Sequence, residues 1–382
     1  MNNKVVVIGG DHHNTLGIIE SFGEKNMKTY AVILTHRKSS YVLHSKYIVE
    51  GWCCKDEKSM IECLSKNFND TKNKAVLIAT NDTSASILDD NFSKLSKFFY
   101  IPTTTPSGTL SNWMSKETMS DLARKVNLNV PKTWIVTDAK IPSDIEYPVI
   151  TKAISSVAGS KDNIKICKQE SELKDFLNNQ SHCPTIQIQK FIEKEFEFQF
   201  LGCSLNSGED IIIPGRTNID RPNGLDNTFF LWFDKYEIEF NDTVQKVKNF
   251  IKATGYTGLF SVEFLKDKND GKSYFTEMNF RNDGNAVCVT AAGTNLPYIL
   301  YLSMIGEDYS QELKKSSVKR TYLMPEFYYF QRLLAREFGF GEWRRNMMLT
   351  NCYTTYFKKD KKPFKYFLLQ KVNRIFEKIR NK

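Results

Sequence analysis

The sequence predicts an α/β and α+β protein with three parts: a doubly wound parallel sheet, a mixed body and a helical C-terminal tail. Three observations support this. Apolar strands alternate with amphipathic stretches over the first 110 residues, strands of alternating polarity recur up to residue 300, and apolar residues recur every three or four positions after residue 364. Because 382 residues are too many for one ordinary core, we expect several units. Their predicted bounds are 1–110, 111–185, 186–310 and 311–382.

The N-terminal unit is predicted from apolar strands at 4–8, 29–34 and 75–79, with helical stretches between them. Gly9 and Gly10 follow the first strand, and Asn81 and Asp82 follow the third. Ligands of parallel sheets bind at the carboxyl ends of the strands, so Gly10, Asn81 and Asp82 are candidate substrate contacts. A tight turn explains the glycines equally well. The sequence GGDHHN is not G-x-G-x-x-G, so no dinucleotide site is predicted.

The mixed body follows the N-terminal unit. A helix is predicted at about 116–127 and ends before Val130-Pro131, and after it single helices lie among short strands. The expected elements are strands at 149–153, 163–167, 185–189 and 195–201, helices at 170–178 and 242–254, and closing strands at 259–265 and 273–279.

The two closing strands carry the residues with the clearest chemistry. Period-two alternation places Glu263 opposite to its apolar neighbours, and places Glu277, Asn279 and Arg281 on one face. If the strands pair as a hairpin, Glu263 lies beside Glu277. Two carboxylates and an amide oxygen suit a magnesium ion that holds ATP phosphates, and Arg281 can stabilise a phosphoryl group in transfer. The alternative is a solvated strand face with a Glu–Arg pair.

A loop of small residues, SSVAGSK at 155–161, follows the strand that carries Lys152. Small residues let backbone N–H groups approach phosphate, and Lys152 supplies positive charge. No G-K-[ST] occurs at Walker spacing, and an ordinary flexible turn is the simpler interpretation of the loop alone. The extended segment at 188–192 offers a backbone edge to an adenine, with acids following for ribose, although a strand with a charged turn also fits.

In order, these pieces resemble the ATP-grasp superfamily, in its carbamoyl-phosphate-synthetase-like branch. The resemblance covers about residues 4–305. It is carried by Lys116, Lys152 with SSVAGSK, QKFIEKEFEF at 189–198, Glu263, and EMNFR at 277–281.

The resemblance implies a role for each piece. Lys116 and Lys152 would bind the ATP phosphates, and the loop residues Ser155, Ser156, Gly159, Ser160 and Lys161 would close over them. Gln189, Lys190, Phe191 and Ile192 would hold adenine through their backbone, with Glu195 on the ribose and Glu197 as its alternative. Glu263, Glu277 and Asn279 would bind two magnesium ions, or manganese in their place, and Arg281 would act in catalysis with Lys152. Two departures are Lys161-Asp162 where relatives carry more glycine, and Gln189 where many carry Glu.

The implied reaction activates a carboxylate as an acyl phosphate with ATP and passes it to an amine, giving an amide, ADP and phosphate. We expect Arg216 or Arg221 to clamp the substrate carboxylate, since a guanidinium suits this task, although a surface salt bridge is nearly as good an interpretation. Similar enzymes include D-aspartate ligases and ligases of surface polysaccharides, so a cell-surface polymer precursor is the expected acceptor. The alternatives are a bicarbonate-using enzyme and a nucleotide-binding module without catalysis.

The net charge of +9 is concentrated at the C-terminus, where residues 358–382 hold ten Lys or Arg and two acids. The remaining chain is nearly neutral, which argues against nucleic acid as a partner and favours small-molecule substrates. The basic tail is either an interfacial helix on an anionic inner membrane leaflet or a helix docked on the body or on an assembly partner. Scattered cysteines without C-x-x-C pairs suit the cytoplasm. A homodimer is a further expectation.

Overall fold

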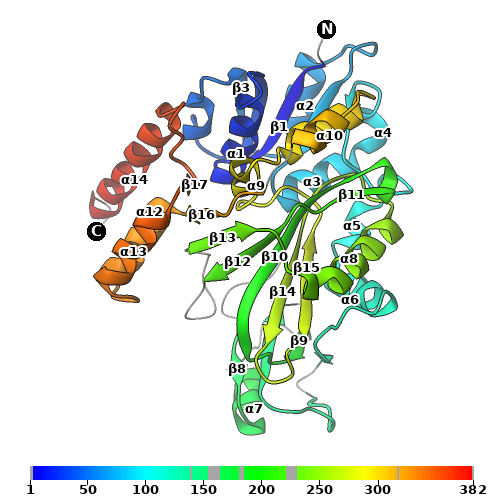
Figure 1. Cartoon of the computed structure of the whole chain (residues 1–382), viewed down its shortest axis with the longest axis vertical. Helices are drawn as coiled ribbons and strands as arrows, with labels where there is room; N and C mark the ends of the chain where they lie inside the picture. Colours follow the sequence, from blue (N-terminus) through cyan, green and yellow to red (C-terminus); the bar gives the residue numbers. More distant parts are fainter. Residues whose placement is uncertain are drawn as a thin grey trace.

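The computed structural model describes residues 3–137, 140–153, 164–179, 185–220, 230–315 and 318–380, with backbone alone described at 152–153, 185 and 374–380. Figure 1 shows a parallel sheet with its helices above a large central sheet, a small sheet below it, and C-terminal helices to one side. The predicted loop at 155–161 and Arg221 lie outside the described residues.

The N-terminal unit is a parallel sheet of order β3-β2-β1-β4-β5 with helices packed around it, which confirms the doubly wound prediction. Its central strands are continuous apolar runs because both faces are covered. The strands are β1 (Val5–Gly10), β2 (Thr29–Leu34), β3 (Ile48–Cys54), β4 (Ala75–Ala79) and β5 (Phe99–Tyr100). The helices are α1 (His13–Gly23), α2 (Glu57–Asn67), α3 (Asp82–Asp90) and α4 (Phe92–Leu95), with the 3-10 turn η1 (Tyr41–His44).

A small antiparallel sheet of order β6-β9-β7-β8 follows. Its strands are β6 (Thr133–Thr137), β7 (Val149–Ala153), β8 (Ile166–Cys167) and β9 (Thr185–Lys190), and α7 (Glu170–Asn178) covers it. The predicted strand at 163–167 is shorter than expected. Two helices lead into this sheet, α5 (Leu110–Trp113) and α6 (Lys116–Lys125).

The large sheet has the order β15-β14-β10-β12-β13-β16-β17, with β11 also paired to β10. Its strands are β10 (Lys194–Leu205), β11 (Asp210–Ile212), β12 (Arg216–Asp220), β13 (Phe230–Asp234), β14 (Gly258–Asp267), β15 (Ser273–Asn279), β16 (Thr321–Met324) and β17 (Cys352–Tyr353). Turns η3 (Asn206–Gly208) and η4 (Ile238–Phe240) connect them, and the amphipathic α8 (Asn241–Thr254) packs its buried Val247 and Phe250 into the core on one face.

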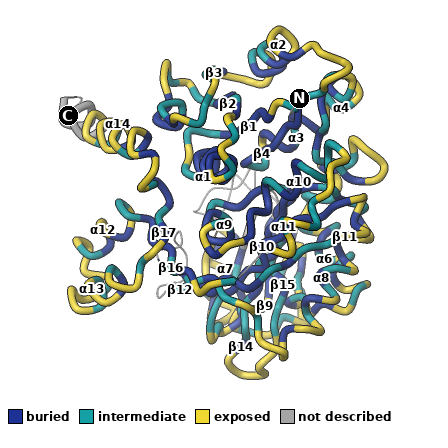
Figure 2. The backbone as a smooth tube through the Cα atoms, turned by 45° about the horizontal axis from the view of Figure 1, so that its top comes forward, coloured by how far each residue is buried: buried dark blue, intermediate teal, exposed yellow. Residues whose placement is uncertain are grey.

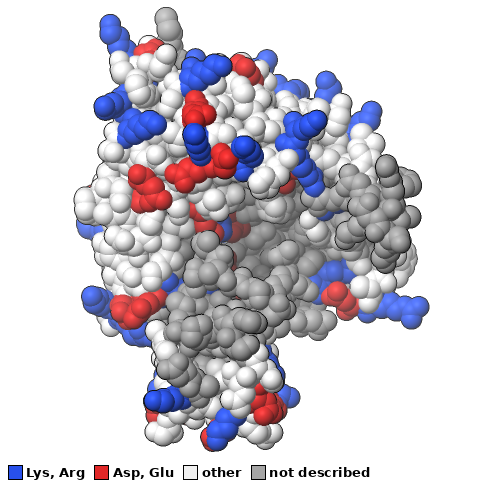
Figure 3. All heavy atoms as spheres, turned by 180° about the vertical axis from the view of Figure 1, so that it is seen from behind, with Lys and Arg blue, Asp and Glu red and all other residues white. Residues whose placement is uncertain are grey.

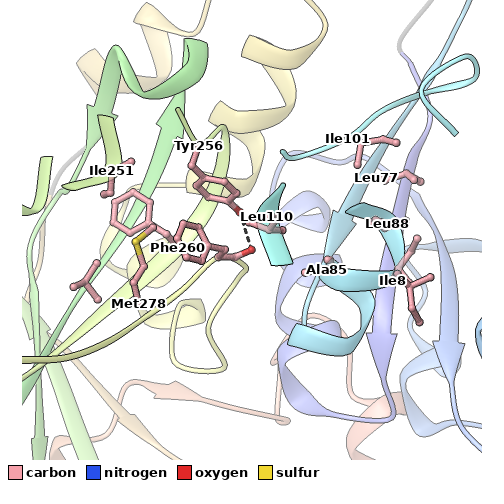
Figure 4. Packing of buried hydrophobic residues seen from close by; sticks show 14 of the residues in the cluster. Ile8, Leu77, Ala85, Leu88, Ile101, Leu110, Ile251, Tyr256, Phe260 and Met278 are labelled. Carbon is pink, nitrogen blue, oxygen red and sulfur yellow. Dashed lines mark hydrogen bonds between the residues drawn. The ribbon is translucent and has the colours of Figure 1, made fainter. Parts of the chain in front are cut away.

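One hydrophobic core joins the N-terminal sheet to the large sheet. Ile8 and Leu77 of the first sheet belong to the same buried cluster as Tyr256, Phe260 and Met278 of the second (Figure 4). Figure 2 shows buried backbone running through both sheets, whereas the C-terminal helices are largely exposed. Because burial of these side chains in one core opposes sliding of the two units, the carboxyl ends of β1 and β4 are held against the large sheet.

The C-terminal part is more than the helical tail that we expected, because β16 pairs with β13 and β17 pairs with β16 in the large sheet. The helices are α9 (Val287–Ala292), α10 (Leu296–Met304), α11 (Ser310–Lys315), α12 (Glu326–Leu334), α13 (Phe340–Leu349) and α14 (Lys362–Arg380). The start of α14 docks on the body, where Phe367 packs edge-on against Tyr41 and Tyr366 stacks on His44. None of the described helices is long and apolar enough to cross a membrane.

A buried pair of carboxyl groups fastens this C-terminal segment to α1. Ser45 Oγ lies 3.1 Å from Glu20 Oε1 and 2.6 Å from Asp360 Oδ2, and the backbone N–H of Lys46 also donates to Asp360. Burial, followed by the charge of Asp360, raises the pKa of Glu20 to about 9. Glu20 is therefore protonated at neutral pH, so the pair does not place two negative charges side by side.

Candidate active site

Three polar side chains form a row across neighbouring strands of the large sheet. Glu277 of β15 pairs directly with Glu263 of β14, which pairs directly with Gln199 of β10. Directly opposite residues in an antiparallel sheet share a face, so the predicted approach of Glu263 and Glu277 is confirmed. Gln199 was missed, although the alternating EFEFQF of β10 places it in phase with Glu197.

A β-bulge beside Glu263 sets which side chains of β15 face this row. Glu263 pairs with Glu277, but Phe264 pairs with Phe275, so Thr276 is the extra residue. The hydroxyl of Thr276 donates to the carbonyl oxygen of Glu263 at 2.9 Å. Phe275 and Met278 can therefore both enter the core while Glu277 stays on the polar face.

Asn279 links Glu263 to Arg281. Its amide nitrogen lies 3.4 Å from Glu263 Oε1, and Gln199 Nε2 donates to the same oxygen at 3.1 Å. Asn279 Oδ1 accepts a hydrogen bond from Arg281 Nη2 at 3.0 Å. Asn279 thus presents its NH2 group to Glu263, and it must turn its amide over before its oxygen can serve as a metal ligand beside that carboxylate.

Arg281 ties the large sheet to the N-terminal unit. Its Nε donates to Asp82 Oδ1 at 3.0 Å, and its Nη1 lies 3.6 Å from Asp283 Oδ2. Burial alone would lower the pKa of Arg281, but the charges of Asp82 and Asp283 outweigh it and raise that pKa. Asp82, predicted as a substrate contact, therefore acts in this structure as the partner of Arg281.

The loop after Arg281 is held against the β1–α1 turn. Asn14 Nδ2 donates to the carbonyl oxygens of Thr80 and Asn282, at 2.6 and 2.7 Å. A Cβ atom at Gly284 would lie 2.7 Å from His13 Nε2, so a larger residue there would force the His13 ring to move. These contacts fix the carboxyl ends of β1 and β4 beside Arg281.

A cavity of about 570 Å3 lies where these parts meet. It brings the predicted residues Gly10 and Asn81 together with Glu263 and Arg281. The lining residues that the sequence did not indicate include His12, Gln199, Asp283, Asn285, Tyr328 and Thr354. Tyr328 and Thr354 come from the C-terminal segment, which no sequence signal placed at the site.

The predicted phosphate and adenine contacts lie on α6, on β7 and at the end of β9. Lys116 is the first residue of α6, which packs against β15. Lys152 lies on β7, where its backbone pairs with that of Gln187 on β9. Gln189 is buried, and its amide donates to Thr133 Oγ1 at 3.2 Å.

The backbone of the predicted adenine segment is partly used within the protein. The N–H group of Lys190 donates to the carbonyl oxygen of Lys132 at 2.8 Å, and that of Phe191 donates to Pro148 at 3.0 Å. Ile192, next along the chain, is buried.

Of the two candidate ribose acids, Glu197 is the better placed. It lies two residues before Gln199 on β10 and shares its face, whereas the register of β10 shifts between Lys194 and Phe196, at Glu195. Glu195 is exposed, and Glu197 is half-buried and ion-paired with Lys194.

Arg216 lies on the other face of the large sheet. It pairs directly with Phe200, and its guanidinium lies 4.2 Å from the centre of the Phe240 ring. Its Nη2 bonds to Glu237 at 2.9 Å. This position does not support the prediction that Arg216 binds the substrate carboxylate, because Arg216 lies on the face of β12 that packs into the core. We therefore leave Arg216 out of the proposed substrate site.

Charged side chains of both signs are interspersed on the face opposite to that of Figure 1 (Figure 3), as expected for a nearly neutral body. Among the described residues, no group of three or more His, Cys, Asp or Glu side chains could hold a metal ion. The oxygen ligands that the prediction names here are the carboxylates of Glu263 and Glu277 and the amide oxygen of Asn279, a hard set that suits Mg2+ when phosphate oxygens complete it.

Comparisons with known proteins bear on the fold. No family model matches the chain. Biotin carboxylase 1 of Bacillus subtilis (strain 168) is 31% identical over an alignment of 159 residues that covers 37% of this chain and 33% of that protein. The match thus spans about one third of the relative's length.

Solved structures match most of the chain at low sequence identity. An L-amino acid ligase from Bacillus licheniformis has a TM-score of 0.65 at 15% identity, covering 84% of this chain and 79% of that one. The N5-carboxyaminoimidazole synthetase of Staphylococcus aureus with ADP has a TM-score of 0.67 at 16% identity, covering 89% and 86%. Biotin carboxylase of Campylobacter jejuni has a TM-score of 0.65 at 16% identity, covering 84% and 75%.

At these identities the likeness establishes the fold. The chain has an ATP-grasp fold with an N-terminal parallel α/β unit, as the resemblance implied.

Proposed function

We propose that this protein is an ATP-dependent carboxylate–amine ligase that forms an amide through an acyl phosphate. The observation that carries the proposal is the row of Glu277, Glu263 and Gln199, with Arg281 beside it. Glu263, Gln199 and Arg281 open into one cavity with Gly10 and Asn81 of the N-terminal unit. The residues that would bind phosphate and those that would bind substrate thus meet at one space large enough for small reactants.

ATP would lie between the small sheet and the large sheet. Lys116 and Lys152 would neutralise its phosphates, together with the loop at 155–161. The backbone at 189–192 would hold the adenine, and Glu197 rather than Glu195 would bind the ribose. This choice is supported by the shared face of Glu197 and Gln199.

Glu263 and Glu277, with the oxygen of Asn279 after its amide turns over, would hold Mg2+. The bound ion would neutralise phosphate charge. Gln199 would keep Glu263 Oε1 in place through the 3.1 Å hydrogen bond seen here.

In the reaction, a carboxylate oxygen of the substrate attacks the γ-phosphorus of ATP and ADP leaves. The amine then attacks the carbonyl carbon of the acyl phosphate, phosphate leaves with the bonding electron pair, and the nitrogen gives up a proton to water or to the departing phosphate. Arg281 would face the charge on the transferred phosphoryl group. Its contact to Asp82 fixes the guanidinium before substrates bind, so little reorganisation is needed.

A second candidate is an enzyme that activates bicarbonate, and one observation favours it. The matched segment of biotin carboxylase 1 and several structural neighbours come from carboxylases, one of them solved with MgADP and bicarbonate. The surface-polymer acceptor, the homodimer, the contact of residues 358–382 with membrane or an assembly partner, and the non-catalytic module stay predictions.

The test is ADP release from the full chain with ATP and Mg2+, in a panel of amino acids, carboxylates and bicarbonate. The ligase proposal expects release that requires both a carboxylate and an amine, with an amide product in the mass spectrum. Release with bicarbonate alone would favour the second candidate. Nucleotide binding without turnover across the panel would contradict both.

A further inference from the structure

A side pocket of about 70 Å3 opens beside the active-site cavity. The two spaces share His12, His13, Tyr328 and Thr354 in their walls. The other walls of the side pocket come from the end of β1, from Arg37 after β2, and from α14 with Lys371. Two parts of the chain that are far apart in sequence thus form a recess with room for a small polar group.

The two acids of the side pocket already have partners from the protein. Asp11 accepts hydrogen bonds from Ser40 Oγ at 2.6 Å and from Arg37 Nη1 at 3.2 Å. Glu326 accepts from the hydroxyl of Thr354 and from the backbone N–H groups of residues 355 and 356, at 2.7–2.9 Å. Their lone pairs therefore hold the pocket together and are poor candidates for binding a cation.

Lys371 has donors to spare. Its ammonium group carries three N–H donors, and one of them bonds to the hydroxyl oxygen of Tyr328 at 3.1 Å. Three aromatic rings surround it, with Phe327, Tyr328 and Phe367 centred 4.8–5.2 Å away. Within the part of the chain that the structure describes, no carboxylate pairs with Lys371. The rings fix the ammonium in position without neutralising it.

Two further residues that line this pocket, Tyr328 and His12, carry hydrogen-bond donors. Because the hydroxyl oxygen of Tyr328 accepts from Lys371, its O–H is left to donate. His12 Nδ1 accepts from the backbone N–H of Asn14 at 3.3 Å, which leaves the proton of a neutral ring on Nε2. Desolvation lowers the pKa of His12, and the charges of Arg281 and Lys371 lower it further against the opposing effect of Asp283 and Asp11, so the ring is neutral at pH 7.

We propose that the side pocket binds an anionic group, a carboxylate or a phosphate, of a ligase substrate, with Lys371 as its counter-charge. The group lies away from the reacting atoms, so it selects the substrate and does not take part in bond making. The inference rests on the proposed function for its assumption that the bound molecule is a substrate. It assigns α14 to substrate recognition, which neither docking on the body nor contact with a membrane requires.

The experiment measures binding and turnover separately. Calorimetry on the full chain with ATP analogue and Mg2+ compares L-aspartate with L-asparagine, L-glutamate with L-glutamine, and O-phospho-L-serine with L-serine. We expect at least one acid to bind about tenfold more tightly than its neutral partner, and Lys371→Met to reduce that preference to about twofold. Lys371→Arg keeps the charge and should keep most of the preference.

Lys365→Met is the matched control, since Lys365 lies on the same helix but is exposed and outside the pocket. It should behave like the wild type. Equal binding of acid and neutral partner in every wild-type pair overturns the proposal, as does a preference that Lys371→Met leaves intact. ADP release without an acid preference would sink this inference and leave the ligase proposal standing. An acid preference that Lys371→Met abolishes, without turnover, would support an anion site at Lys371 and contradict the ligase proposal.

Discussion

The two faces of the large sheet use neighbouring residues of the same strands for different tasks. On one face, Gln199 and Glu263 stand beside each other at the active-site cavity. On the other, Phe198 and Phe264 stack at 5.1 Å in the hydrophobic core. Because successive side chains of a strand point to opposite faces of the sheet, adjacent residues belong one to the polar face and one to the hydrophobic core. The difference between the faces predicts which substitutions should affect catalysis and which stability.

The largest effect is expected from the polar face. Glu263→Gln combined with Glu277→Gln keeps the shape of the row but removes both charges that would hold Mg2+. We expect ADP release to fall by about 10³-fold, measured by steady-state kinetics at saturating ATP. The melting temperature should stay within about 2 °C of the wild type, because both residues are only half-buried.

Glu209→Gln is the control for this pair, since it is the same chemical change at an exposed ion pair with Lys252. It should leave turnover unchanged. A double variant that retains more than a tenth of the activity would contradict the metal assignment.

The residues of this row could be predicted from the sequence because alternation is local. Glu263 and Glu277 stand on strands whose polar and apolar residues alternate, and Arg281 follows the second strand in the same phase, so their common face follows from spacing once the two strands pair as a hairpin. Gly10 and Asn81 follow from the rule that ligands bind at the carboxyl ends of parallel strands. The N-terminal strands could also be predicted from a local signal, because each is a continuous apolar run.

The rest of the site depends on tertiary contacts that carry no local signal. β16 and β17 span Thr321–Met324 and Cys352–Tyr353, too short for a recognisable period, so their addition to the large sheet was not foreseen. The pairing of Asp82 with Arg281 joins residues 199 positions apart. The face of the sheet on which Arg216 lies could not be predicted, because the strand that follows Pro214-Gly215 has only five residues and too few apolar positions to show which ones point into the core.

The next effect in size is expected from the core face. Phe264 is 1% exposed and touches the rings of Phe198, Phe200 and Phe275. Phe264→Ala should lower the free energy of unfolding by about 3–5 kcal/mol, measured by urea denaturation at low temperature. Turnover per folded molecule should change by less than about twofold. A variant of wild-type stability, or a folded variant that has lost activity, would break the division between the two faces.

A smaller effect is expected where the site meets the N-terminal unit. Asp82→Asn removes the charge that pairs with Arg281 but keeps an oxygen acceptor. We expect kcat to fall by about tenfold with the KM for ATP unchanged, since the guanidinium loses its fixed position while nucleotide contacts remain. Asp121→Asn, an exposed acid paired with Arg124, should have no effect. A rise in the KM for a substrate at constant kcat would instead make Asp82 a binding residue.

The smallest effect, and the sharpest test of the two-face division, is expected at Arg216. Burial lowers its pKa, and its Nε and Nη1 atoms have no hydrogen-bond partner among the described residues. Its side chain is 8% exposed, whereas that of its partner Glu237 is 59% exposed, so the attraction within the pair roughly offsets the cost of burying the guanidinium.

Arg216→Met fills a similar volume against Phe196, Phe198 and Phe240 and removes the cost of burying a charge. The free energy of unfolding should therefore stay within about 1 kcal/mol of the wild type, and kcat/KM within about twofold. Glu237→Ala should be the more harmful change, because it leaves the buried guanidinium without its counter-charge. If Arg216→Met instead raises the KM for the carboxylate substrate while the fold is retained, Arg216 must reach the site through a rearranged strand β12, and the face on which a residue lies would no longer decide its task.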